Sequence, residues 1–231
     1  MALPINEVPK YTCKLPSTGQ TITYRPFLVK EQKVMLTALE SEDDVEIGSA
    51  VNSTLQSCIE TDLNVLNLPI FDFEYLFLKI RSKSVGEVIK LKLKCPDDDK
   101  QIVEHELNLE EVNVTRPEGH TNKIEFEPGY GIIMQYPTIK SFKKFDNLGE
   151  MPYEVIKDSI KTIYKGDDVY DRNNIEEAEL DDFINSLTQK QFKQLQSFFE
   201  TMPRIRHTID YKNPVSGKDF SVTLNGSADF F

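Results

Sequence analysis

Two neighbouring segments alternate apolar and charged residues, and this alternation constrains the fold more than any other feature of the sequence. Residues 89–95 alternate apolar side chains with lysines, and residues 103–109 alternate apolar side chains with acidic ones. A period of two is the repeat of a β-strand that buries one face. The run Pro-Asp-Asp-Asp-Lys at 96–100 is typical of a turn, so the two segments are predicted to form a β-hairpin.

One register of this hairpin satisfies both of its faces, because apolar residues then face apolar residues and lysines face glutamates. The pairs that this register predicts are Leu93–Val103, Lys92–Glu104, Lys90–Glu106 and Leu91–His105. A histidine in that position is more typical of a packed residue than of a metal ligand.

Similar patterns predict the other elements. Two further hairpins are expected at 10–25 and 205–224, and a strand at 124–126. Residues 131–139 fit either a helix or a strand, and residues 165–174 are expected to form a polar loop. Helical spacing predicts six helices, at 29–41, 45–60, 70–83, 152–165, 175–187 and 188–201. The sequence therefore predicts an α+β fold in which several β-hairpins pack with about six helices.

The expected domain organisation is simple. Residues 1–231 are predicted to form a single α+β domain, since no low-complexity linker interrupts them. A subdivision would fall in the region 116–150, where the pattern is weakest.

Composition excludes several classes of function. The net charge of −11 opposes binding to nucleic acids and to anionic membranes. The first residues lack the features of a signal peptide, and no apolar stretch is long enough for a membrane span. The odd number of cysteines, Cys13, Cys58 and Cys95, fits a reducing compartment. We therefore expect a protein that works inside a cell and binds neither membranes nor nucleic acids.

No motif indicates catalysis. The sequence has no phosphate-binding glycine loop and no nucleophile elbow, and its three histidines are far apart. The acidic stretch 167–179 does not fit a calcium loop, since Val169 and Ala178 stand where ligands are required. We predict no catalytic residue, cofactor, bound metal or small-molecule substrate.

Two hairpin tips partly match a metal-binding pattern. A zinc knuckle often reads Cys-Pro-x-Cys-Gly, and Cys95 with Pro96 matches its start. Asp98 stands in place of the second cysteine, and Asn213 and Ser216 replace both cysteines in the other tip. One thiol is too few for a tetrahedral zinc site. Two ordinary turns and a lost zinc ribbon both explain the pattern.

Several segments, taken in order along the chain, resemble the baseplate hub and hub-assembly proteins of T4-like bacteriophages. These segments are Leu15 to Gly19, Tyr24 to Glu31, Phe71 to Phe77, Arg81 to Glu87, Lys94 to Asp97, Arg116 to His120, Leu224 to Gly226 and Asp229 to Phe231. The resemblance implies a non-enzymatic protein that helps to build the central hub of a contractile tail. It implies other baseplate hub and tail proteins as partners. It also implies work in the host cytoplasm during phage assembly, with the virion baseplate as a second location.

Two other functions fit the residues less well. A transient tail-assembly chaperone, for example one for the tape-measure protein, would suit an acidic body with terminal aromatic residues. An enzyme that uses one of the carboxylate clusters would require a deep acidic pocket.

The predicted partner-binding residues lie near the chain ends. They are Tyr24, Arg25 and Phe27 beside the first hairpin, and Phe230 and Phe231 at the C-terminus. Aromatic residues and arginine are frequent energetic anchors at interfaces. The alternative for the terminal phenylalanines is burial in the protein's own core.

Overall fold

The computed structural model describes residues 7–127, 129–142 and 153–226. Contacts within the chain divide it into two compact units. The larger unit contains Met1–Thr115 and Arg204–Phe231, and the smaller unit contains Arg116–Pro203. The described residues form seven α-helices and eleven strands in small antiparallel sheets, which confirms the α+β fold.

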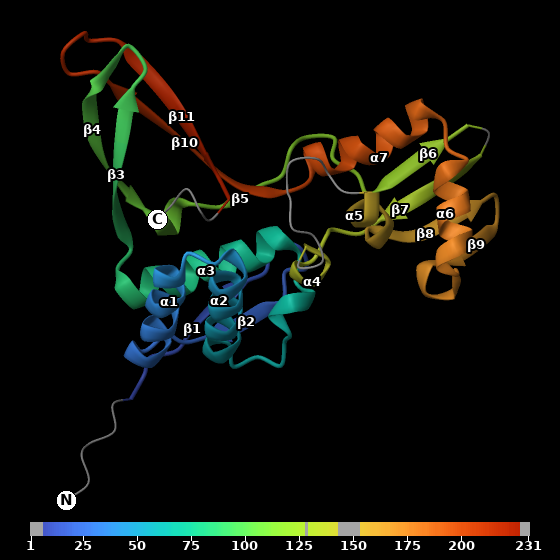
Figure 1. The fold of residues 1–231 in the computed structure, drawn as a ribbon, viewed down its shortest axis with the longest axis horizontal. Helices are drawn as coiled ribbons and strands as arrows, with labels where there is room; N and C mark the ends of the chain where they lie inside the picture. The colour runs from blue at the N-terminus through green and yellow to red at the C-terminus, as the bar shows by residue number, and fades with distance from the viewer. Residues whose placement is uncertain (1–6, 128, 143–152, 227–231) are drawn as a thin grey trace, which may run out of the picture. The chain divides into compact units, whose positions relative to one another are not determined.

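The larger unit begins with a hairpin followed by three helices (Figure 1). The hairpin pairs Tyr11 with Tyr24 and Lys14 with Thr21. The elements are β1 (Tyr11–Lys14), β2 (Thr21–Tyr24), α1 (Val29–Ser41), α2 (Asp44–Cys58), the 3-10 helix η1 (Val65–Asn67) and α3 (Ile70–Val85). The hairpin and the three helices predicted from sequence are confirmed.

Helix boundaries in this region follow from capping residues. Asp43 lies before α2, and its side chain accepts hydrogen bonds from the amides of Val45 and Glu46. Helix α3 buries apolar residues on more than one side, among them Phe71, Leu76 and Ile80. It is therefore a central element of the unit, as its double apolar stripe predicts.

Two long hairpins complete the larger unit (Figure 1). Their strands are β3 (Val88–Cys95) with β4 (Asp98–Asn108), and β10 (Arg204–Lys212) with β11 (Asp219–Asn225); η2 (Leu109–Glu111) and β5 (Val114–Thr115) follow β4. Strand β5 pairs with β10. The predicted register of the first hairpin is confirmed at all four pairs, Leu93–Val103, Lys92–Glu104, Lys90–Glu106 and Leu91–His105.

The two hairpins share one hydrophobic core with α3. Its buried members are Leu78, Ile89, Leu93, Leu107, Leu109, Val112, Ile205, Ile209 and Leu224. The buried residues of β3 alternate with exposed lysines, so the period-two pattern of the sequence identifies the face that packs.

The smaller unit is a four-stranded antiparallel sheet with helices (Figure 1). The sheet order is β6 (Lys123–Phe126), β7 (Tyr130–Met134), β8 (Ile160–Lys165) and β9 (Asp168–Asp171). The other elements are α4 (Ile139–Phe142), α5 (Tyr153–Asp158), η3 (Arg172–Asn174), α6 (Glu177–Asn185) and α7 (Gln189–Thr201). Apolar residues of the sheet, α5, α6 and α7 form one core.

The prediction of one helix over 152–165 is wrong in its second half. Helix α5 ends at Asp158, and β8 begins at Ile160. Ile160, Thr162 and Ile163 are β-branched and pack well on a sheet, although Ile156 and Ile160 also fit a helical spacing. The expected loop at 165–174 likewise contains β9 and η3, and the undecided segment 131–139 contains β7.

The divisions between the units lie after Thr115 and after Pro203. The first falls beside the region 116–150, and the second has no counterpart in the sequence prediction. Among the described residues, no helix is long and apolar enough to cross a membrane.

We predict that residues 116–203 fold when they are expressed alone, because they are continuous and contain a core of their own. Circular dichroism should show mixed helix and strand signals and a cooperative thermal transition. The same fragment with Ile132→Asp should not fold, since Ile132 is fully buried. A wild-type fragment without a cooperative transition would instead favour one cooperative domain over 1–231.

Candidate interaction site

Arg25 connects the first hairpin to the two helices that follow it. Its guanidinium donates hydrogen bonds to Glu31 Oε1 at 3.0 Å and to the Ser57 carbonyl at 3.0 Å. It also donates to the Pro26 carbonyl at 2.9 Å and lies 3.8 Å from Cys58 Sγ. One side chain therefore joins the end of β2 to the first turn of α1 and the last turn of α2.

The contact between Arg25 and Glu31 is an ion pair, so the connection that Arg25 makes depends on the charge of Glu31. Burial alone would raise the pKa of the Glu31 carboxyl, but hydrogen bonds from Arg25 and from the Leu28 amide outweigh burial and lower the pKa. The bond from Leu28 belongs to the capping box that begins α1. Arginine suits such a site because its donors form a fixed planar fork.

Tyr24 and Phe27 lie before and after Arg25 in the sequence. Tyr24 is 2% exposed and its ring lies 5.9 Å from that of Tyr11. Phe27 is half-buried, and its amide donates to Ser84 Oγ at 2.9 Å. Tyr24, Arg25 and Phe27 thus lie in one short segment between β2 and α1, and Phe230 and Phe231 lie outside the described residues.

The turn of the first hairpin is fixed to α3. Asp72 is fully buried and accepts hydrogen bonds from the amide, at 3.0 Å, and the hydroxyl of Ser17. Burial raises the pKa of the Asp72 carboxyl, and the two bonds from Ser17 partly oppose that shift. This arrangement gives the segment around Ser17 a structural role.

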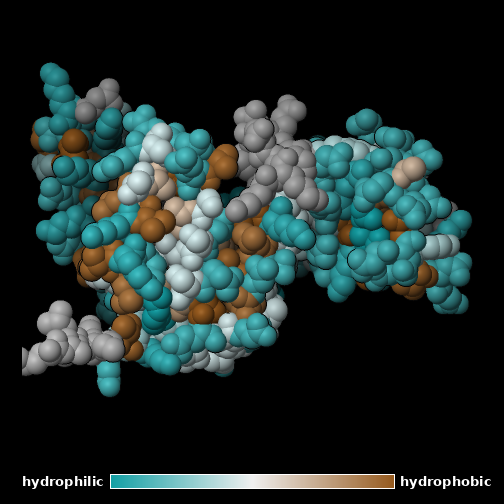
Figure 2. All heavy atoms as spheres, turned by 60° about the horizontal axis from the view of Figure 1, so that its bottom comes forward, coloured by the Kyte–Doolittle hydropathy of each residue, from teal (hydrophilic) through white to brown (hydrophobic). Residues whose placement is uncertain are grey.

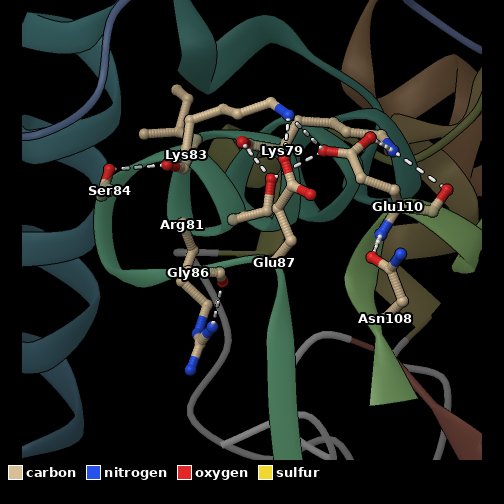
Figure 3. A network of polar contacts seen from close by, with 10 residues as sticks. Lys79, Arg81, Lys83, Ser84, Gly86, Glu87, Asn108 and Glu110 are labelled. Carbon is tan, nitrogen blue, oxygen red and sulfur yellow. Dashed lines mark hydrogen bonds and ion pairs between the residues drawn. The ribbon is translucent and has the colours of Figure 1, made fainter.

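A second polar network joins α3 to η2, as Figure 3 shows. Lys79 Nζ lies 2.7 Å from Glu110 Oε2, and Ser82 Oγ donates to Glu110 Oε1 at 2.9 Å. Lys83 Nζ lies 3.3 Å from the same Oε1. Burial would raise the pKa of the Glu110 carboxyl, but the bonds from Lys79 and Ser82 outweigh burial and lower it.

The tips of the two long hairpins meet at Asp97. Its Oδ1 accepts a hydrogen bond from Asn213 Nδ2 at 2.7 Å, and its Oδ2 accepts one from Ser216 Oγ at 2.6 Å. Asn213 Oδ1 accepts hydrogen bonds from the amides of Val215 and Ser216 at 2.8 and 3.2 Å. These contacts, with Asp97 at their centre, form what we call the tip clamp.

The tip clamp lies where the sequence partly matches a zinc pattern. Asn213 and Ser216 take the places of two cysteines, but Asp97, and not Asp98, binds them. Hydrogen bonds from Ser216 and Asn213 lower the pKa of the Asp97 carboxyl. A carboxylate between two hairpin tips could not be anticipated from either tip by itself.

Metal binding and catalysis find little support in the part of the chain that the structure describes. There, no group of three or more His, Cys, Asp or Glu residues is placed to hold a metal ion. Burial raises the pKa of the Cys58 thiol to about 11, which makes it a poor nucleophile at neutral pH. The absence of a bound metal stays a prediction that elemental analysis of the purified protein can test.

The acidic residues of the smaller unit neutralise a buried lysine. Lys157 Nζ lies 2.6 Å from Asp181 Oδ1 and 3.2 Å from Glu177 Oε2. The hydrogen bond to Asp181 is the main cause that raises the pKa of Lys157. Hydrogen bonds from Arg172 and Lys157 lower the pKa of Glu177, whereas a general acid needs a raised pKa.

His120 also has a structural environment. Its Nδ1 lies 3.0 Å from Thr201 Oγ1, and its Nε2 lies 3.1 Å from the Tyr136 hydroxyl. The His120 and Tyr136 rings are stacked, and burial lowers the pKa of the imidazole. The polar partners of this histidine are those of a packed residue.

Comparison with known families assigns the chain to one family. The model of the T4 bacteriophage base plate protein family matches residues 8–231, which is nearly the whole chain. No curated protein and no solved structure matches the chain. The chain therefore belongs to the T4 bacteriophage base plate protein family. It is a T4-like baseplate protein, and its class is structural.

We predict that Asn213→Ala lowers the free energy of unfolding by about 1–3 kcal/mol, because two backbone amides and Asp97 lose a buried partner. Denaturant titration measures this loss. Ser221→Ala, at an exposed position of the same hairpin, is the control and should change little. Equal stability of the two variants would show that the tip clamp contributes nothing.

We predict that Lys79→Met destabilises the protein by about 1–3 kcal/mol at neutral pH, since Glu110 loses its nearest cation. The lowered pKa of Glu110 means that this stabilisation is complete above the ordinary glutamate value of about 4.3. It is lost as the pH falls through the lower pKa of the folded state. Denaturant titrations across this range should therefore converge in acid.

The control for Lys79→Met is Lys92→Met, which removes an exposed lysine of β3. This variant should match the wild type at every pH. A Lys79→Met defect that stays constant into acid would contradict a role for the charge of Glu110.

Proposed function

We propose that this protein takes part in assembling the central hub of a contractile phage tail by binding other hub proteins, without catalysing a reaction. The observation that carries the proposal is the family match over residues 8–231. The match spans both compact units, which supports a role that uses the whole chain.

The chemistry of the site supports binding over catalysis. Among the described residues, the buried Glu31, Lys79 and Lys157 each have an opposite charge within hydrogen-bonding distance. The fully buried Asp72 is held instead by the amide and hydroxyl of Ser17. Such contacts fix the elements that carry them, and rigid elements are what a specific protein interface needs. Work in the host cytoplasm during assembly, followed by a place in the baseplate, fits this role.

We further propose that the chain ends contact the partner. Arg25 holds the segment that contains Phe27, and Phe27 keeps part of its surface accessible. Phe230 and Phe231 supply the apolar area that an anchor requires. Buried Tyr24 would act by supporting this segment.

A transient tail-assembly chaperone is the second candidate, and the net charge of −11 favours it, because an acidic body suits a basic client such as a segment of the tape-measure protein. The two functions differ in the final location of the protein. A hub subunit is present in purified mature particles, whereas a chaperone is found only in extracts of infected cells.

Affinity capture from infected cells, followed by quantitative mass spectrometry, tests the proposal. We expect baseplate hub proteins to be recovered in fixed ratio with the tagged chain. Recovery of the tape-measure protein without hub proteins would favour the chaperone. Recovery of no tail protein would contradict both functions.

We predict that deletion of Phe230 and Phe231 reduces the capture of hub proteins and leaves the melting temperature nearly unchanged, because these residues act as anchors. Differential scanning calorimetry and the capture assay provide the two readouts. A melting temperature lowered by several degrees, with capture intact in the folded fraction, would show that the two residues belong to the core.

A further inference from the structure

Helix α1 exposes a regular stripe of side chains, which we call the seam. The seam consists of Val29, Gln32, Leu36 and Leu39. Its three apolar members are 66%, 51% and 56% exposed, respectively. At about 100° per residue, all four lie within a sector roughly 80° wide. Figure 2 shows hydrophobic patches exposed on the larger unit among hydrophilic ones.

The seam lies apart from the contacts that hold α1 to the unit. Only Glu31 and Ala38 of its thirteen residues are buried. Ala38 lines the groove between α1 and α2 together with Val34, Ala50 and Ser53. The intramolecular face of α1 is thus accounted for, and the seam points elsewhere.

The spacing of the seam is that of a helix-packing surface. Its members follow one another at intervals of three, four and three residues, as the a and d positions of a coiled coil do. Single exposed apolar residues are ordinary on a protein surface. Three on one helical stripe, with a polar Gln32 among them, form a surface suited to another helix.

The charges beside the seam indicate which helix packs against it. Lys33 lies three residues before Leu36, and Glu40 lies three residues after Thr37. At helical spacing both lie on the same side of the seam. A two-fold axis between Leu36 and Thr37 would therefore place the Lys33 of each copy beside the Glu40 of the other.

The order of these charges is unfavourable within a single helix. The N-terminal half of α1 carries Lys30 and Lys33, and its one acidic residue, Glu31, is buried and paired with Arg25. The last turn carries Glu40 and no basic residue. The helix dipole favours the opposite order. In an antiparallel pair of α1 helices, the Lys33 of each copy approaches the acidic end of the other copy, which also includes Glu42 and Asp43.

We propose that the seam is a self-association surface, on which α1 of a second copy packs antiparallel in a two-fold symmetric dimer. Leu36 and Leu39 form its apolar centre, and the two Lys33–Glu40 contacts flank it. A helix of this length is about 20 Å long, so the interface is small and the dimer is expected to dissociate in the micromolar range.

Sedimentation velocity of the full-length protein, over a concentration series that spans this range, tests the proposal. The wild type should shift from monomer to dimer. Leu36→Gln should abolish the shift. Val34→Gln is a matched control, since Val34 is also 51% exposed on α1 but lies off the seam, and it should dimerise as the wild type does.

Charge reversal tests the antiparallel orientation. Lys33→Glu and Glu40→Lys should each weaken self-association about ten-fold or more, because two attractive contacts become repulsive. The double variant should recover it. A mixture of the two single variants should form mixed dimers, in which every contact again joins opposite charges.

Two results would overturn the proposal. One is a wild type that stays monomeric at every concentration. If Leu36→Gln then also removes a different protein from affinity captures, the seam binds a helix of that protein and not a second copy. The other is a dimer that Leu36→Gln and Val34→Gln affect equally. Dimerisation without rescue in the charge mixture would contradict the antiparallel arrangement.

Discussion

The contact between Arg25 and Glu31 joins the first hairpin of the larger unit to the two helices that follow it. It places a guanidinium between the end of β2, the start of α1 and the end of α2. If Arg25 were absent, Glu31 would keep a buried charge without its main cationic partner, which is destabilising. This ion pair therefore helps to fix the start of α1 relative to the end of β2 and the end of α2.

Similar polar joints recur where the sequence resembles baseplate hub proteins. The segment at Leu15 to Gly19 contributes Ser17, which binds Asp72 of another such segment. Phe27 and Ser84 connect two more. In the Lys94 to Asp97 segment, the Lys94 carbonyl accepts a hydrogen bond from Tyr211, and Asp97 holds the tip clamp. These segments therefore contribute to the frame of the unit, and they need no catalytic role to explain their side chains.

Much of the fold could be predicted because local pattern and tertiary packing agree. The Lys and Glu alternation predicted the register of β3 and β4 at all four pairs, but not its shift between Lys94 and Cys95. Prediction failed at 152–165, where Ile156 and Ile160 fit a helix but Ile160 begins a strand. The polar contacts between distant segments were harder to predict. The contact of Asp97 with Asn213 spans more than a hundred residues, and no local spacing encodes such a contact.

Complementation in infected cells tests the central claim most directly, namely that this chain acts by assembling the baseplate hub. The measurement is the yield of complete baseplates, counted by electron microscopy, from a phage that lacks the gene, with and without the protein supplied from a plasmid. Without the chain, hub proteins should accumulate unassembled, and the supplied protein should restore complete baseplates. Normal numbers of complete baseplates in its absence would contradict the account.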